Sequence, residues 1–361
     1  MPCLIQREKL WLMIATSFLT VIGIVFVYSA GTYWGKIHYG QTAPFLVKQL
    51  IYLAVALFAF FICSRHKGLQ LEKTWTLLYW FSLLLLVAVL IPGIGVVRNG
   101  SQSWIAIGPL SLQPSELTKI ATIVKLSFIL ANQKATESKI HWRHFLYLFL
   151  PIALIMLQPD FGSAFILIVS VFLLFFIAGY PIRFYAFLII AGVLGLVGLI
   201  LSAPYRLKRI EAFLDPWSDP LGSGFQAIQS LLAIGPAGLY GFGFGNSRQK
   251  YLYLPEPQND FIFSIIAEEM GFIGAATIIC AFGLLMYAGL KLAYNSSLKV
   301  SLYCIATLIG MIGFQAFLNI GVVSGLLPVT GVTLPFISYG GTSLVVTWMA
   351  IGIVWNFSKQ R

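Results

Sequence analysis

Acidic side chains are scarce in this chain, so an acid beside an apolar segment needs an explanation. Only twelve of the 361 residues are Asp or Glu, and Asp260 ends the run YLYLPEPQND directly before a long apolar stretch. A carboxylate at the edge of a membrane is partly desolvated, which raises its pKa and suits a general base acting near neutral pH. The alternative interpretation is that Asp260 only caps a helix that begins at Phe261.

Glu116 and Lys119 form a second candidate group, in the sequence QPSELTKI at the start of another apolar stretch. Three residues apart, they share one face of a helix and can neutralise each other. An ionised side chain at membrane depth costs roughly 2.5–3.5 kcal/mol, so such residues usually face a polar cavity. Pro114 and Ser115 fit the N-terminus of that helix, and Ser115 is a candidate supporting residue. A purely structural ion pair, or snorkelling at the helix end, explains the pair equally well.

Five basic residues share one long polar segment with Asp260 and could together hold a pyrophosphate group. They are Arg206, Lys208, Arg209, Arg248 and Lys250. The alternative is that they are only solvated charges. For Glu268, Glu269 and Asp160, structural pairing is the expectation.

Several common catalytic and metal-binding patterns are missing from the sequence. There is no HExxH, no His cluster with zinc spacing and no nucleophile elbow. The glycines of GFGFGNS at 241–247 precede no GK[ST], which argues against a nucleotide loop. The four cysteines contain no CxxC pair, so we expect neither a disulfide nor a metal site with thiolate ligands.

The elements that must position these side chains are membrane-spanning helices. Hydrophobic residues make up 59% and charged residues 10% of the chain, with a mean hydropathy of +0.88, whereas soluble domains contain roughly 25% charged residues. A span needs about 20 mostly apolar residues. Ten stretches qualify, at approximately 10–30, 44–64, 73–91, 114–131, 144–158, 163–179, 184–202, 261–290, 300–322 and 341–356.

The distribution of Lys and Arg predicts the orientation, because these residues are retained on the cytoplasmic side. With the termini inside, the inner segments carry thirteen basic residues and the outer segments eight. Five of those eight lie in the long segment 203–260, and the charges of long loops have little influence on orientation. The predicted fold is therefore an all-α multi-pass membrane protein of about ten transmembrane helices, with both termini cytoplasmic and a long extracellular loop, 203–260. The net charge of +11 is scattered singly over loops, which argues against nucleic-acid binding.

One membrane domain, 1–361, accounts for the whole chain, since the two halves do not mirror each other in their helix breaks as an inverted-repeat transporter would. Segment 222–236 has apolar residues at helical spacing. It lies either in the membrane interface as an amphipathic helix or on the bundle as an ordinary loop helix. Trp104 fits an interfacial anchor better than a platform for a sugar.

Three motifs, in this order, resemble the FtsW/RodA/SpoVE family of elongation, division and sporulation proteins. They are RNGSQSWIAIGPLSLQPSELTKI at 98–120, DPWSDPLGSGFQAIQSL with GNSRQKYLYLPEPQNDFIFSIIAEEMGFIG within 215–274, and NIGVVSGLLPVTGVTLPFISYGGTSL at 319–344. The resemblance runs from the first span to the last. The wording SRQKYLYLPEPQNDFIF is closer to the division and sporulation branch than to the elongation branch.

This resemblance implies a ten-helix glycosyltransferase of the bacterial cytoplasmic membrane that polymerises lipid II. Asp260 then matches the family's essential aspartate, Glu116 and Lys119 the charges of its PSE motif, and Trp104 the tryptophan of its SWI motif. Many relatives carry His-Thr before that aspartate. This chain has Gln258-Asn259 instead, so a role for a histidine there is not available.

We expect the outer ends of the fourth and eighth spans to enclose a cavity in which Asp260 accepts the proton of a sugar hydroxyl. Basic groups, or a divalent cation such as Mg or Mn, would stabilise the leaving pyrophosphate. The expected partners are lipid II, membrane lipid, a class B penicillin-binding protein and other division or sporulation proteins. The alternative functions are a lipid II flippase and a non-enzymatic scaffold for the penicillin-binding protein.

Overall fold

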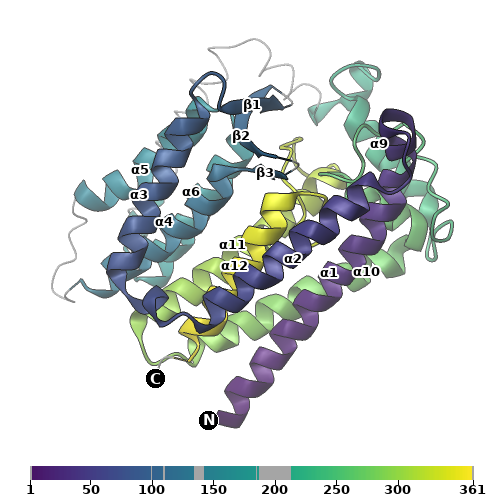
Figure 1. The fold of residues 1–361 in the computed structure, drawn as a ribbon. Coiled ribbons are helices and arrows are strands. Elements are labelled where there is room, and N and C mark those ends of the chain that lie inside the picture. Colours follow the sequence, from purple (N-terminus) through teal and green to yellow (C-terminus); the bar gives the residue numbers. More distant parts are fainter. Residues whose placement is uncertain are drawn as a thin grey trace.

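The computed structural model of the chain describes residues 2–98, 100–108, 110–133, 142–183, 185–186 and 213–359, and it is mostly helical (Figure 1). Its longer helices are α1 (Pro2–Tyr39), α2 (Pro44–Arg65), α3 (Glu72–Val89), α4 (Pro114–Ala131), α5 (Trp142–Leu157), α6 (Phe161–Ile177), α10 (Ile262–Tyr294), α11 (Lys299–Val323) and α12 (Gly341–Phe357). Each coincides with a predicted apolar stretch. The predicted seventh stretch, 184–202, lies outside the described residues apart from 185–186.

Length and composition separate these helices into two groups. Among the described residues, α1, α2, α3, α10 and α11 are each long and apolar enough to cross a bilayer. The apolar helices α6 and α12 have 17 residues each, while α4 has 18 residues but includes Glu116, Lys119 and Lys125. The prediction of a mostly helical protein with several apolar helices is therefore confirmed.

Helices α11 and α12 lie in the middle of the bundle. Figure 1 shows α3, α4, α5 and α6 on one side of them, and α1, α2 and α10 on the other. The most extensive helix pairs are α2 with α12, α1 with α10, α10 with α11 and α3 with α4, and α11 also contacts α4 and α6. The outward face of α2 carries exposed apolar side chains, including Val47, Leu50, Phe58 and Phe61, which suits contact with lipid.

The start of α1 and the end of α12 lie at the same end of the bundle (Figure 1). The opposite end carries a small β-sheet and the short helix α9 (Phe225–Ile234), and we call it the sheet end.

The expectation of an all-α protein is wrong for the segment between α3 and α4. Three antiparallel strands form there, β1 (Gly95–Arg98), β2 (Ser101–Ile107) and β3 (Leu110–Leu112). Arg98 pairs with Ser101, so only Asn99-Gly100 connects β1 to β2, and Gly100 has a φ of 82°. Glycine adopts such a positive φ without the steric cost that a Cβ would bring.

Helix α9 confirms the predicted helix within 222–236, and the structure favours the second of its two interpretations. Its buried residues, Ile228, Ser230 and Ala233, face the bundle, where α9 contacts α10 and α11. The Ser230 hydroxyl donates a hydrogen bond of 2.7 Å to the Val323 carbonyl. The helix is therefore packed on the bundle through both apolar and polar contacts.

Helix α10 is interrupted at Gly271, whose φ of 67° and ψ of −165° are not helical. The segment 238–243 takes up the hydrogen bonds that the interruption frees. The Phe242 amide donates to the Glu268 carbonyl at 2.9 Å, and the Phe272 amide donates to the Gly238 carbonyl at 2.9 Å. A membrane helix can be broken only where its freed backbone groups find such partners.

Candidate functional site

Asp260 lies at the sheet end, in the turn immediately before α10, and is held there by its main chain. The Asn319 side-chain amide of α11 donates 2.6 Å to the Asp260 carbonyl and 2.7 Å to the Val332 carbonyl. The Tyr339 amide donates 2.8 Å to the Gln258 carbonyl. Residues of the motif 319–344 thus fix the position of the aspartate.

The Asp260 carboxylate is partly buried and does not cap α10. The N-cap residue is Phe261, and no side chain makes a cap hydrogen bond there. Among the described residues, no group of another residue donates a hydrogen bond to this carboxylate. Burial raises the pKa of Asp260 to about 6, and the negative charge of nearby Glu256 raises it further, while the residue's own amide opposes the shift. The carboxylate is therefore ionised at neutral pH and ready to accept a proton.

Unpaired acceptors occur on the two residues before Asp260 and on Asn319, which holds its main chain. Among the described residues, the side-chain oxygens of Gln258, Asn259 and Asn319 are buried and receive no hydrogen bond. Buried acceptors without donors are costly, so this turn carries polar groups whose hydrogen-bonding capacity is unused.

Glu116 and Lys119 form a buried ion pair on α4, with 2.8 Å between Oε1 and Nζ. The Lys119 ammonium also donates 3.2 Å to the Gln315 side-chain oxygen of α11, and the Gln315 amide donates 3.0 Å to the Thr333 carbonyl. Gln315 lies one helical turn before Asn319 and therefore on the same face of α11. The pair is linked through α11 to the residue that holds Asp260.

Ser115 joins α4 to α6 through Asp160. The hydroxyl of Ser115 and the side-chain amide of Gln113 both donate to Asp160 Oδ2, at 3.1 and 2.9 Å. Asp160 is the N-cap of α6, since its Oδ1 accepts 3.1 Å from the Ser163 amide. Asp160 thus has the structural role expected for it.

Trp104 lies on β2, opposite Val96 of β1, and is half-buried. The sheet is tied to α12 near this point. The Thr342 hydroxyl donates 2.8 Å to the Ser111 carbonyl of β3 and accepts 3.1 Å from the Gln113 amide. Through these bonds the motif 98–120 contacts the motif 319–344.

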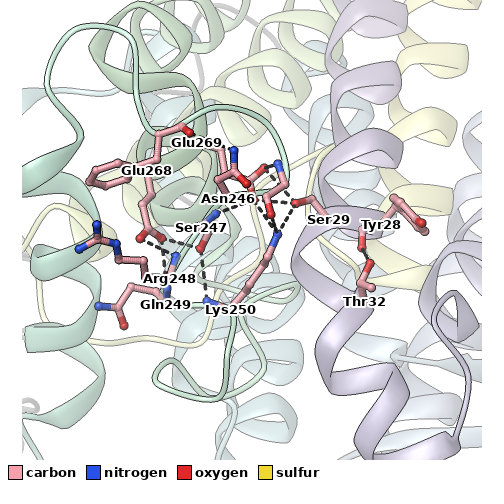
Figure 2. Close-up of polar contacts among 12 residues, drawn as sticks. Tyr28, Ser29, Thr32, Asn246, Ser247, Arg248, Gln249, Lys250, Glu268 and Glu269 are labelled. Carbon is pink, nitrogen blue, oxygen red and sulfur yellow. Dashed lines mark hydrogen bonds and ion pairs between the residues drawn. The ribbon is translucent and has the colours of Figure 1, made fainter.

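The basic residues of the long outer segment have different environments. Arg206, Lys208 and Arg209 lie outside the described residues. Arg248 is exposed, with its guanidinium 4.9 Å from the centre of the Phe242 ring. Lys250 is buried and forms an ion pair with Glu269 at 3.2 Å (Figure 2). The Lys250 ammonium is therefore held by Glu269 inside the protein.

Glu268 and Glu269 are paired as expected, mostly with main-chain groups of the segment 245–250. Glu268 accepts 2.8 Å from the Arg248 amide and 2.5 Å from the Ser247 hydroxyl. Glu269 accepts 2.9 Å from the Gly245 amide and 2.7 Å from the Ser29 hydroxyl of α1 (Figure 2). These two buried carboxylates hold the segment in place.

The sequence reasoning missed Gln315, Asn319 and Ser29. A usable signal existed for the two amides: they lie four residues apart in a stretch that is otherwise apolar, FQAFLN. Polar side chains within a span face the protein interior or a cavity. No local pattern distinguished Ser29.

Comparison with known proteins confirms the resemblance to the FtsW/RodA/SpoVE family. The sequence model of that family, described as "Cell cycle protein", matches residues 10–361. Stage V sporulation protein E of Bacillus subtilis (strain 168) is 44% identical over 355 residues, covering 97% of this chain and 96% of that protein. A probable peptidoglycan glycosyltransferase FtsW of Saccharophagus degradans is 39% identical over 362 residues, covering 98% and 93%.

Two solved structures share the fold. A chain from the structure described as "Structural coordination of polymerization and crosslinking by a peptidoglycan synthase complex" superposes with a TM-score of 0.78 at 32% identity, covering 96% of each chain. The rod shape determining protein RodA of Thermus thermophilus superposes with a TM-score of 0.71 at 28% identity, covering 96% of this chain and 95% of RodA. The similarity therefore extends over nearly the whole chain.

Proposed function

This chain belongs to the FtsW/RodA/SpoVE family of cell cycle proteins, and from that membership we infer that it is a peptidoglycan glycosyltransferase of the bacterial cytoplasmic membrane. It polymerises lipid II into glycan strands during cell division or sporulation. The relatives named FtsW and stage V sporulation protein E, at 39% and 44% identity, support this branch of the family.

In our proposal the chain crosses the membrane ten times and the sheet end faces the outside. Both termini are then cytoplasmic, and the long segment 203–260 is external. The shared side of α1's start and α12's end supports this arrangement (Figure 1), as does the excess of Lys and Arg on that side. Asp260 then lies where the lipid meets the external water.

Asp260 acts as the general base. Its carboxylate accepts the proton of the acceptor sugar's 4-hydroxyl while that oxygen bonds to the donor's anomeric carbon with inversion. The bond from that carbon to the polyprenyl pyrophosphate breaks, and its electron pair leaves with the phosphate. The observation that carries this role is a carboxylate with a raised pKa, about 6, in a turn lined by unpaired acceptors.

The leaving pyrophosphate meets positive charge. Arg248 is the described residue best placed for this role, because its guanidinium is exposed on the segment that leads to Asp260. Arg206 and Arg209 keep the same proposed role, whereas Lys250 supports the segment from within. A Mg or Mn ion bound to the pyrophosphate would neutralise part of its charge.

Glu116, Lys119, Ser115 and Trp104 support the cavity. The Glu116–Lys119 pair holds α4 against α11, and Ser115 holds α4 against α6. Trp104 anchors the sheet at the depth of the headgroups. None of these side chains is assigned a proton-transfer step.

A purified-protein assay tests the general base directly. Wild type in detergent should convert lipid II to polymer, which a flippase or a scaffold would not do. Asp260→Asn, of almost the same size, should lose activity by a factor of about 10²–10⁴, as expected for a general base. The matched control is Glu72→Gln, the same type of change in the Glu72–Lys125 pair at the opposite end of the bundle. Polymer formation by Asp260→Asn at the wild-type rate would remove Asp260 as the base.

A class B penicillin-binding protein is the proposed partner, together with other division or sporulation proteins. The support is the similarity to a chain of a peptidoglycan synthase complex that joins polymerization to crosslinking. Co-purification of the two proteins from one membrane, at fixed stoichiometry, is the expected result. Separation of the two under mild detergent conditions would argue against the assembly.

A further inference from the structure

The segment 244–251 is fastened along one face of α1. The Phe26 and Phe244 rings meet edge to face with 5.7 Å between their centres, and the Tyr33 and Tyr251 rings do the same at 4.9 Å. Ser29 lies between Phe26 and Tyr33 on α1, at helical spacing from both. Its hydroxyl donates to Glu269, which also pairs with Lys250.

The same segment is fastened to α10 by carboxylates. Glu268 accepts from the amides of Arg248 and Gln249, at 2.8 and 3.4 Å, and from the Ser247 hydroxyl at 2.5 Å. Both Glu268 and Glu269 are buried. A buried carboxylate needs this many donors, because its charge is otherwise poorly compensated away from water. The main chain around Arg248 is thus fixed more tightly than an external loop usually is.

One side chain of this fixed stretch faces away from it. Ser247, Gln249 and Lys250 are buried, whereas Arg248 is exposed. Figure 2 shows the Arg248 side chain directed away from Ser29 and Lys250. The Phe242 ring lies beneath the guanidinium, at 4.9 Å, and restricts its orientation further.

We propose that Glu268 is a positioning residue for the leaving group: it fixes the main chain of Arg248 so that the exposed guanidinium binds the diphosphate of the lipid-linked donor. A guanidinium held in one orientation binds two phosphate oxygens with little further loss of entropy. Glu269, with Ser29 and Lys250, fastens the same segment to α1. This inference rests on the proposed function, which supplies the diphosphate.

A double-mutant cycle on the full-length protein tests it, with direct binding of inorganic pyrophosphate as the readout. Glu268→Gln replaces one of the two accepting carboxylate oxygens with an NH₂ group, which cannot accept from the donors of residues 247–249. The main chain of Arg248 is then held less firmly, and pyrophosphate binding should weaken about tenfold. Arg248→Ala should weaken binding at least as much. Combined, the two changes should be no worse than Arg248→Ala alone, because Glu268 acts through Arg248. Additive losses, or unchanged binding in Glu268→Gln, would overturn the proposal.

Separate control experiments distinguish a loss of pyrophosphate binding from misfolding and from a loss of catalysis. Glu72→Gln should bind pyrophosphate as wild type does, and each variant is compared by thermal unfolding and gel filtration. If Glu268→Gln does not fold, Ser247→Ala removes one bond to Glu268 and should give a smaller loss that disappears in the Arg248→Ala background. A loss that persists in that background contradicts the proposal. Pyrophosphate binding can be measured in Asp260→Asn as well, so failure of the proposed catalytic role is distinguishable from failure of this one.

Discussion

Asp260 is fixed through its main chain by Asn319, whereas its carboxylate is left without a donor from another described residue. Partial burial and the charge of Glu256 raise its pKa to about 6. A base with this pKa is ionised at neutral pH but still basic enough to remove a proton in the transition state.

The raised pKa predicts the pH dependence of polymerisation. The rate should rise with pH and reach half its maximum near pH 6, where Asp260 loses its proton. Glu256→Gln removes a negative charge that raises this pKa, while the new side chain can still accept from Asn259. The acidic limb of the profile of kcat/KM should therefore move to lower pH. If the acidic limb stays at the same pH in Glu256→Gln and is absent in Asp260→Asn, the limb reports Asp260 but the charge of Glu256 does not raise its pKa.

The same pKa predicts a cost in stability. Asp260 binds its proton more tightly in the folded protein than in the unfolded chain, where the pKa is 3.8. Its contribution is therefore most favourable below pH 3.8 and is lost as pH rises through about 6. Asp260→Asn cannot ionise, so its Tm at pH 7.5 should exceed that of wild type, with a difference that shrinks toward pH 4. Thermal unfolding in detergent measures this, and a lower Tm for the variant at pH 7.5 would contradict the burial argument.

At the scale of elements, two helices place the site. Helix α11 supplies Gln315 and Asn319 from one face, and these link the Glu116–Lys119 pair of α4 to the turn that carries Asp260. Helix α10 is broken at Gly271, which lets the segment 238–243 join the bundle and brings the segment 245–250 against Glu268 and Glu269. The break is thus a structural requirement of the site.

Two glycines of α10 give a matched test of that requirement. Gly271 has a φ of 67°, and a Cβ there would collide with the main chain of Gly241 and Leu239. Gly271→Ala should therefore destabilise the protein by at least ~1–3 kcal/mol and reduce polymerisation. Gly283 has helical geometry and open space around it. Gly283→Ala should leave activity unchanged and stabilise the helix by as much as ~1 kcal/mol. Equal Tm values for the two variants would show that the break is not needed.

At the scale of the whole molecule, the site occupies one end of the bundle and the chain termini the other. The motifs 98–120, 215–274 and 319–344 are far apart in sequence and meet at the sheet end. The third motif binds the first through Thr342 and the second through Asn319 and Tyr339. In the proposed orientation this end faces outward, where a lipid-linked substrate would be polymerised.

Cysteine labelling in intact spheroplasts tests that orientation. Leu221 and Tyr294 are both highly exposed, at 88% and 84%. Leu221 lies just before α9 at the sheet end, and Tyr294 is the last residue of α10, at the opposite end of the bundle. With a membrane-impermeant maleimide, Leu221→Cys should react and Tyr294→Cys should react only after lysis. The reverse pattern would place the sheet end in the cytoplasm. Of the native thiols, Cys63 and Cys304 are buried and should stay unlabelled without denaturant.

The sequence by itself determined where the apolar helices lie, because a bilayer selects each span by its own local composition. It also indicated Asp260, Glu116 and Lys119 as candidate site residues, because charges are conspicuous beside apolar runs. Only the tertiary structure decided which partners these groups have. Asn319 holds Asp260 from 59 residues away, and Ser29 reaches Glu269 from 240 residues away. The burial of Lys250, which looked solvated in sequence, follows from that second contact. Hydropathy is a local property, whereas the compensation of a buried charge depends on residues that only the folded chain brings together.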